Sequence, residues 1–390
     1  MSRRRAVVLV LDGVGAGAAV DADAFGDAGS DTLGNTARAV GGLRLPVLEG
    51  LGLGTVAPIA GLRPVERPLA LCGLLRERSA GKDTTTGHWE LMGLLTREPF
   101  PVYPHGFPSE VMRAFAARTG RGWLCNAPAS GTEVIARLGE EHMRTGDLIV
   151  YTSADSVFQV AAHEDVVPVD ELYRACLAAR EILDGPHRVA RVIARPFTGA
   201  PGAFTRTHRR RDFSVPPHGP TVLDVLTGHG LTVAGVGKIG QIFAGRGVTV
   251  DRPSAGNADG MRITGELLDD GDAALVFVNL VDFDSSFGHR NDPPGFAACL
   301  AEFDAALPAL LGRLGEHDLL LVTADHGNDP TTPSTDHSRE WVPLLIVRPG
   351  REAGGARWVG EYADAGRTVL EWLAPGAPVG GLAGRPVPLP

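Results

Sequence analysis

The sequence has few cysteines and no excess of basic residues, and each shortage excludes a class of protein. Its four cysteines, Cys72, Cys125, Cys176 and Cys299, form no close pair. This spacing excludes a disulfide framework and a thiolate metal site, and it indicates a reducing compartment. A formal net charge of −9 leaves no cationic surplus to neutralise phosphates, which argues against a nucleic-acid partner.

Long hydrophobic runs are also missing. No stretch approaches the roughly 18 apolar residues of a membrane-spanning helix. Arg3 to Arg5 precede the run AVVLVL, as basic residues do in a signal peptide. That run is too short for the hydrophobic region of a signal peptide, and no small-residue cleavage pattern follows it. We therefore expect a cytoplasmic protein without a membrane partner.

The apolar residues come instead in short runs that end abruptly at polar residues. The clearest are AVVLVL before Asp12, ALVFVNLV before Asp282 and DLLLVTA before Asp325. Such runs are typical of fully buried parallel strands, and stretches such as 169–183 and 294–314 have helical spacing. The alternation predicts an α/β fold whose mostly parallel sheet is flanked by helices, with functional side chains at the carboxyl ends of strands.

Two stretches rich in proline and glycine, 96–108 and 214–220, mark crossings between domains. Both are poor sequences for the interior of a helix or strand, and the segment between them has its own strand and helix signals. We predict that a smaller α/β domain, residues 99–214, is inserted into a core domain formed by residues 1–98 and 215–390.

Six potential metal ligands follow the predicted strands. They are Asp12, Asp284, His289, Asp325, His326 and His337. Taken singly, each residue is weak evidence for a metal site. An aspartate at a strand end is more often a cap, and a lone histidine more often packs in the core. Together, three carboxylates and three imidazoles suit Mn, Zn or Fe(II) and are too many for one tetrahedral ion. The set predicts a site for two divalent ions.

The stretch KDTTTGHWE adds three consecutive hydroxyls, those of Thr84, Thr85 and Thr86. A hydroxyl placed beside two divalent ions loses its proton more easily and becomes a nucleophile. The same stretch resembles a helix N-terminus, which stabilises a phosphoryl group. Alternatively, Asp83 or Thr84 only caps that helix. These arguments predict a phosphoryl site and leave the choice among the three hydroxyls open.

The motifs together resemble those of the phosphopentomutases, the prokaryotic metal-dependent family of the alkaline phosphatase superfamily. The resemblance covers nearly the whole chain, and its most specific parts are GKDTTTGHWE and TADHGNDPTTPSTDHSREWVPLL. It implies an alkaline-phosphatase-like core with an inserted cap domain. It also implies an isomerase that interconverts ribose 1-phosphate, or 2-deoxyribose 1-phosphate, and the 5-phosphate through a phosphothreonine and a bisphosphate intermediate.

The resemblance also implies a role for individual residues. Asp284, His289 and His337 would hold one Mn²⁺, and Asp12, Asp325 and His326 would hold the other. In the family the hydroxyl after Lys-Asp carries the phosphoryl group, so Thr84 is the expected nucleophile. A sugar bisphosphate would act as activator. Ser153 and Asp155 would contact sugar hydroxyls, and Arg191, Arg206 and Lys238 would bind the distal phosphate.

Some alternatives stay open. Alternatively, Arg191 and Arg206 are ordinary solvated charges. Arg195 is a further candidate on which no prediction rests. His88 and Trp89 form either a substrate wall or part of the core. Another enzyme of the superfamily, such as a cofactor-independent phosphoglycerate mutase or a phosphatase, would use the same six ligands, whereas the threonine and the YTSADS and FTRT motifs favour a pentose mutase. A scaffold protein without activity is disfavoured because no ligand is missing. Oligomeric state is not predicted.

Overall fold

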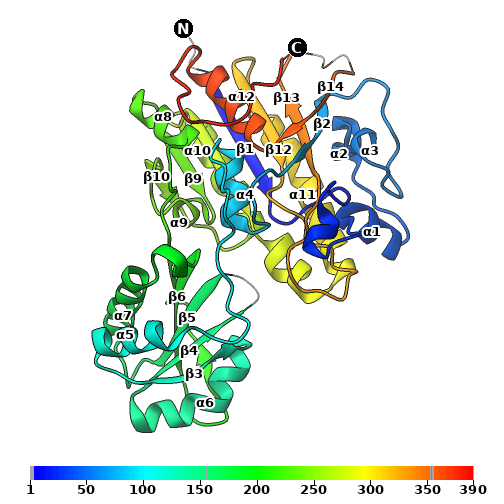
Figure 1. Ribbon diagram of the computed structural model, residues 1–390. Helices are drawn as coiled ribbons and strands as arrows, with labels where there is room; N and C mark the ends of the chain where they lie inside the picture. Colours follow the sequence, from blue (N-terminus) through cyan, green and yellow to red (C-terminus); the bar gives the residue numbers. More distant parts are fainter. Residues whose placement is uncertain (1–3, 154–155, 352, 354, 390) are drawn as a thin grey trace. The chain divides into compact units, whose positions relative to one another are not determined.

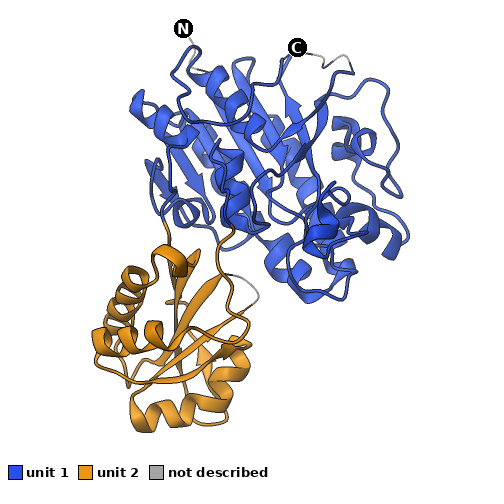
Figure 2. Cartoon of the chain, in the orientation of Figure 1, with its two compact units in different colours: residues 1–98, 216–390 blue, residues 99–215 orange. Residues whose placement is uncertain are grey.

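The computed structural model describes residues 4–153, 156–351, 353 and 355–389. The chain divides into two compact units (Figure 2). Unit 1 comprises Met1–Glu98 and Pro216–Pro390, and unit 2 comprises Pro99–Val215. The boundaries expected from the two stretches rich in proline and glycine lie within one residue of these limits. Each unit has its own sheet and helices, described separately below.

Unit 1 is built on an eight-stranded sheet in the order β10-β9-β11-β1-β12-β13-β2-β14 (Figure 1). Its strands are β1 (Arg5–Leu11), β2 (Leu71–Arg76), β9 (Val233–Val236), β10 (Val250–Arg252), β11 (Leu275–Leu280), β12 (Asp318–Thr323), β13 (Val342–Val347) and β14 (Arg357–Glu361). The pairings are parallel except for the two that β13 makes, with β12 and with β2. The predicted mostly parallel sheet is confirmed.

Helices flank this sheet in two contacting groups (Figure 1). One group contains α4 (Thr84–Leu91), α8 (Val222–Gly228) and α12 (Ala363–Leu373), and the other contains α1 (Thr32–Ala39), α2 (Pro46–Leu51), α10 (Asn257–Asp270) and α11 (Pro293–Leu311). The short helices α3 (Leu53–Val56) and α9 (Ile239–Ile242) complete the unit. With helices on both sides, all residues of β11 and β12 are buried. This double burial explains why these strands are continuous apolar runs without alternation.

Helix α11 differs from the expectation that no stretch is long and apolar enough to span a membrane. By length and composition it is able to cross a membrane, and 39% of its 18-residue apolar window is buried. In the structure it packs against α1, α2 and α10. Its buried carboxylate, Asp304, accepts hydrogen bonds from the backbone amides of Val47 and Leu48, 3.2 and 2.7 Å away, at the start of α2. One side of α11 therefore packs within unit 1.

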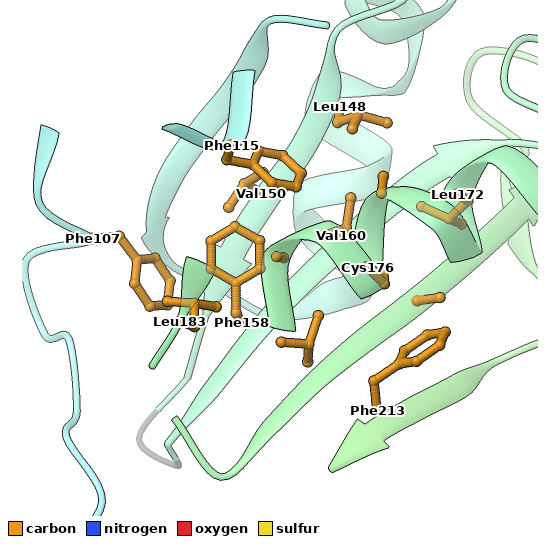
Figure 3. Packing of buried hydrophobic residues seen from close by; sticks show 14 of the residues in the cluster. Phe107, Phe115, Leu148, Val150, Phe158, Val160, Leu172, Cys176, Leu183 and Phe213 are labelled. Carbon is orange, nitrogen blue, oxygen red and sulfur yellow. The ribbon is translucent and has the colours of Figure 1, made fainter. Parts of the chain in front are cut away.

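Unit 2 contains a second sheet in the order β3-β4-β5-β6-β7, with β8 also paired to β6. Its elements are α5 (Ser109–Thr119), β3 (Trp123–Pro128), α6 (Gly131–Thr145), β4 (Leu148–Thr152), β5 (Val157–His163), α7 (Val169–Ile182), β6 (Arg191–Thr198), β7 (Thr205–Arg206) and β8 (Arg211–Ser214). Phe115 of α5, Phe158 of β5 and Leu172 of α7 belong to the larger apolar cluster (Figure 3). Ile149 and Tyr151 point to the opposite face, where they pack with residues of α6.

Candidate active site

The order of three central strands brings the distant carboxylates together. Strands β11, β1 and β12 are adjacent and parallel, so their carboxyl ends meet at one edge of the sheet. Asp12 directly follows β1 and Asp325 lies two residues after β12. Asp284 lies in a single wide helical turn, Phe283–Phe287, that follows β11. All three carboxylates are buried there.

One group of potential ligands consists of Asp12, Asp325 and His326, whose ligand atoms lie within 4.8 Å of one another. Nε2 of His326 is 3.3 Å from Oδ1 of Asp12 and 3.3 Å from Oδ2 of Asp325. Both of these oxygens are buried and accept no aligned hydrogen bond from the described residues. Buried oxygens of this kind are costly unless something satisfies them. A divalent cation would do so, and the carboxylate and imidazole donors suit it.

A second group consists of Asp284, His326 and His337, again within 4.8 Å. Nε2 of His337 lies 3.5 Å from Oδ1 of Asp284, and Nε2 of His289 lies 3.1 Å from Oδ2 of the same carboxylate. All six predicted ligands therefore adjoin one another. The structure places His326 within reach of both groups, whereas the resemblance assigned it to one. The division of ligands between two ions stays a prediction.

Residues behind the ligands orient them. Nδ2 of Asn279 donates to Asp12 Oδ2 at 2.9 Å, and Nδ2 of Asn328 donates to Asp284 Oδ1 at 2.6 Å. Nδ1 of His289 lies 2.6 Å from the carbonyl oxygen of Thr335, which can only accept, so the ring donates through Nδ1 and turns Nε2 toward Asp284 and the ligand cluster. Sequence reasoning missed both asparagines, although they lie in the quoted stretches ALVFVNLV and TADHGNDPTTPSTDHSREWVPLL.

The charges of the cluster set each other's protonation. Burial raises the pKa of Asp284, but the imidazoles of His337 and His289 outweigh it and hold that pKa well below its usual range. Burial lowers the pKa of His326, yet the carboxylates of Asp325 and Asp12 raise it well above its usual value. The carboxylate of Asp284 is thus ionised at neutral pH, as a metal ligand must be.

The three threonines occupy different environments at the start of α4. Asp83 caps this helix: Oδ1 accepts from the backbone amide of Thr86 at 3.1 Å, and Oδ2 accepts from the Thr86 hydroxyl at 2.6 Å. Thr86 is therefore engaged in the cap, and Thr85 is buried. Thr84 is only half-buried, and its Oγ1 lies 3.1 Å from Nε2 of His326. The hydroxyl that adjoins the ligand cluster is that of Thr84.

Charged residues hold the turn that precedes α4. Nη1 of Arg339 donates to the carbonyl oxygen of Gly81 at 2.7 Å and is 2.8 Å from Oε2 of Glu77. Nζ of Lys82 is 3.1 Å from the carboxylate of Asp27 and 3.5 Å from that of Asp336, the residue before His337. The turn with Thr84 is thereby tied to the segment that carries His337.

The predicted substrate-binding residues lie in both units. Lys238 is half-buried between β9 and α9 in unit 1, and Ser153, Arg191 and Arg206 belong to unit 2. Asp155 lies outside the described residues. Arg206 pairs with Phe197 across β6 and β7, six positions along β6 from Arg191. The backbone register thus separates the two arginines, and it does not bring them directly together.

Two further residues of unit 2, Arg195 of β6 and Tyr151 of β4, lie on one face of its sheet. Arg195 projects from β6 on the α6 face, and its Nε donates to Oε1 of Gln159 at 3.1 Å. Burial, reinforced by the positive charge of Arg210, lowers the pKa of Arg195 to about 10. The hydroxyl of Tyr151, on the same face, is buried and has no hydrogen-bond partner among the described residues. This face of unit 2 combines guanidinium groups with an unsatisfied hydroxyl, which suits an anionic ligand.

Comparisons with known proteins extend over nearly the whole chain. A family model described as the metalloenzyme superfamily matches residues 4–374. A phosphopentomutase from Anaeromyxobacter dehalogenans (strain 2CP-C) is 59% identical over 380 residues, which are 97% of this chain and 97% of the relative. A phosphopentomutase from Dictyoglomus turgidum (strain DSM 6724 / Z-1310) is 54% identical over 371 residues, 95% of this chain and 94% of the relative.

Among solved structures, the phosphoglycerate mutase of Leishmania mexicana is similar with a TM-score of 0.51 and 15% sequence identity. The match covers 100% of this chain and 98% of that one. At this level of identity the likeness concerns the fold alone.

Proposed function

Because the chain belongs to the phosphopentomutase family of the metalloenzyme superfamily, and is therefore a metal-dependent isomerase, we propose a specific reaction and nucleophile for it. The protein interconverts ribose 1-phosphate, or 2-deoxyribose 1-phosphate, and the corresponding 5-phosphate. Thr84 carries the phosphoryl group between the two positions of the sugar. The observation that carries this proposal is the 3.1 Å separation between the Thr84 hydroxyl and the imidazole of His326.

The proposed reaction has two phosphoryl transfers. In the first, the free hydroxyl of the sugar monophosphate attacks the phosphorus on phosphorylated Thr84. The new oxygen–phosphorus bond forms as the bond to Thr84 Oγ1 breaks, and a sugar bisphosphate results. In the second, Oγ1 attacks the other phosphorus, and the sugar oxygen leaves and regains the proton lost in the first step. The isomeric monophosphate is released and Thr84 is phosphorylated again.

The ligand cluster supports the use of two divalent ions. Asp12, Asp325 and His326 would hold one ion, and Asp284, His289 and His337 the other. Bound there, divalent ions neutralise charge on the transferring phosphoryl group and lower the pKa of a nearby hydroxyl. We propose manganese, in keeping with the oxygen and nitrogen donors. Asn279 and Asn328 keep the carboxylates oriented through hydrogen bonds of 2.9 and 2.6 Å.

The substrate's second phosphate is proposed to bind to basic side chains. Arg191, Arg206 and Lys238 remain the proposed ligands, with Ser153 and Asp155 for the sugar hydroxyls. The position of Arg195 and its partly buried charge support adding it to the phosphate ligands. A sugar bisphosphate would rephosphorylate enzyme that has lost its phosphoryl group. A cytoplasmic location and the absence of nucleic-acid and membrane partners stay predictions.

The deciding experiment compares two substrates. We expect the purified protein with Mn²⁺ to isomerise ribose 5-phosphate, faster after a bisphosphate primer is added, and to leave 3-phosphoglycerate unchanged. Activity with 3-phosphoglycerate alone would replace the proposal by a phosphoglycerate mutase.

A further inference from the structure

His88 is fully buried one helical turn after Thr84 in α4. Its Nδ1 lies 2.9 Å from the backbone carbonyl oxygen of Thr84 and 3.0 Å from Oδ2 of Asp325. A carbonyl oxygen only accepts hydrogen bonds, so Nδ1 carries the proton. Nε2 of His88 is buried without a hydrogen-bond partner in the described part of the chain. The N–H group at Nδ1 therefore faces both the residue proposed as nucleophile and a potential metal ligand.

The backbone is built to allow this contact. A β-carbon placed on Gly87 would lie 2.1 Å from the carbonyl oxygen of Asp325, far inside van der Waals contact. Helix α4 therefore packs directly on the backbone of Asp325, and only glycine fits at this point. The close approach brings the next residue, His88, within reach of the Asp325 carboxylate. The Gly-His pair of KDTTTGHWE thus has a physical reason beyond apolar packing.

The two oxygens of Asp325 have different surroundings. Oδ1 accepts from the backbone amide of Gly13 at 3.2 Å. Oδ2 lies between Nδ1 of His88 and Nε2 of His326, 3.0 and 3.3 Å away, and accepts no aligned hydrogen bond. The carboxylates of Asp12 and Asp284 are each held by an asparagine amide, whereas Asp325 has His88 in the corresponding place. Groups behind a ligand typically affect metal affinity by 10- to 100-fold.

We propose that His88 is a positioning residue that fixes the ligand Asp325 relative to Thr84 by presenting Nδ1–H to both. It touches neither substrate nor the reacting atoms. The inference rests on the proposed function, in which Asp325 binds a divalent ion and Thr84 is phosphorylated. If His88 only filled space against Phe277, whose ring centroid is 5.8 Å away, the position of its N–H group would not matter.

Two amide substitutions separate these roles. In His88→Asn the side-chain amide takes the place of Nδ1, and in His88→Gln it takes the place of Nε2. Mn²⁺ affinity, measured by calorimetric titration with Mn²⁺ alone, is expected to stay within a few-fold of wild type in His88→Asn. It should fall by about tenfold or more in His88→Gln. His88→Leu, which keeps apolar volume, should bind Mn²⁺ as weakly as His88→Gln.

The outcome is decided by the Asn/Gln pair even if His88→Leu does not fold. An Asn variant that binds Mn²⁺ no better than the Gln variant overturns the inference, as does wild-type affinity in His88→Leu. The rate of Thr84 phosphorylation at saturating Mn²⁺, followed by intact-mass measurement, provides a second readout. This rate is expected to be lower in the Gln variant than in the Asn variant. If the wild type forms no phosphothreonine, the proposed function fails, while the Mn²⁺ titrations still test His88.

Discussion

Oγ1 of Thr84 lies 3.1 Å from Nε2 of His326, although 242 positions separate the two residues along the chain. Thr84 begins helix α4, and His326 follows strand β12 near the centre of the larger sheet. Nδ1 of His326 lies 3.1 Å from the carbonyl oxygen of Gly327 and therefore carries a proton. The opposite nitrogen, Nε2, is the atom shared by the two carboxylates and the threonine hydroxyl. A single imidazole thus connects the proposed nucleophile to the ligand cluster.

Replacement of Thr84 by alanine is expected to lower mutase activity by at least about 10³-fold, because the phosphoryl group loses its acceptor. Intact-mass spectra after priming with a bisphosphate should lack the phosphate adduct. Thr85→Val provides the matched control, since Thr85 is buried and adjoins none of the ligand atoms in the contacts described above. Wild-type activity in Thr84→Ala would refute the mechanism.

Removal of metal with a chelator is expected to abolish mutase activity, and added Mn²⁺ should restore it. Wild-type protein should bind two Mn²⁺ ions per chain. His326→Ala should weaken both sites, because His326 lies within reach of both ligand groups, whereas His289→Ala should weaken one. Equilibrium dialysis with metal analysis measures the stoichiometry. Two ions bound with unchanged affinity in both variants would contradict the assigned ligands.

Arg195→Met is expected to raise the KM for ribose 5-phosphate by about tenfold or more, since a charge-assisted hydrogen bond contributes about 1.5–3 kcal/mol. Mn²⁺ affinity should not change. Arg118→Met is the control: Arg118 belongs to the same unit but lies on α5, where it pairs with Glu181 at the surface. Steady-state kinetics on both variants decide between a substrate ligand and a structural charge. An equal effect of the two substitutions would assign no specific role to Arg195.

His142 in unit 2 is expected to resist protonation. Burial lowers its pKa, and its Nε2 accepts a hydrogen bond from the backbone amide of His163 at 2.8 Å. Above pH 6.5, the ordinary pKa, the ring is unprotonated in both folded and unfolded chains, so no penalty arises. As pH falls below that value, the unfolded chain binds a proton that the folded chain does not, and unit 2 loses stability.

NMR of the imidazole signals tests this directly, with the His142 resonance expected to titrate below pH 6.5. In a denaturant series, His142→Phe should be less stable than wild type at pH 7, because it leaves backbone groups unpaired. The difference in free energy of unfolding between wild type and His142→Phe should narrow toward pH 5, because the wild type loses the stability described above and phenylalanine takes up no proton. A difference that stays constant with pH would show that His142 does not cause the pH dependence.

Much of the architecture could be predicted from local patterns. The uninterrupted apolar runs of β1, β11 and β12 indicate strands buried on both faces, and the aspartates that follow them mark the functional edge of the sheet. Helix α7 was expected at 169–183 and spans Val169–Ile182. Such elements depend on residues close in sequence, whose spacing alone reports burial.

The contacts of the site depend on positions far apart in the chain. Asn279, Asn328 and His88 each reach a ligand carboxylate, yet no spacing in the sequence assigns them that place. The same holds for the three threonines: chemistry leaves them equivalent, and only the fold puts Thr86 in the cap of α4 and Thr84 beside His326. Local sequence settles which residue types stand at each strand end. Which side chains meet follows from the order β11-β1-β12 and from the close packing of α4 on Asp325, because contacts between distant residues are decided by tertiary packing.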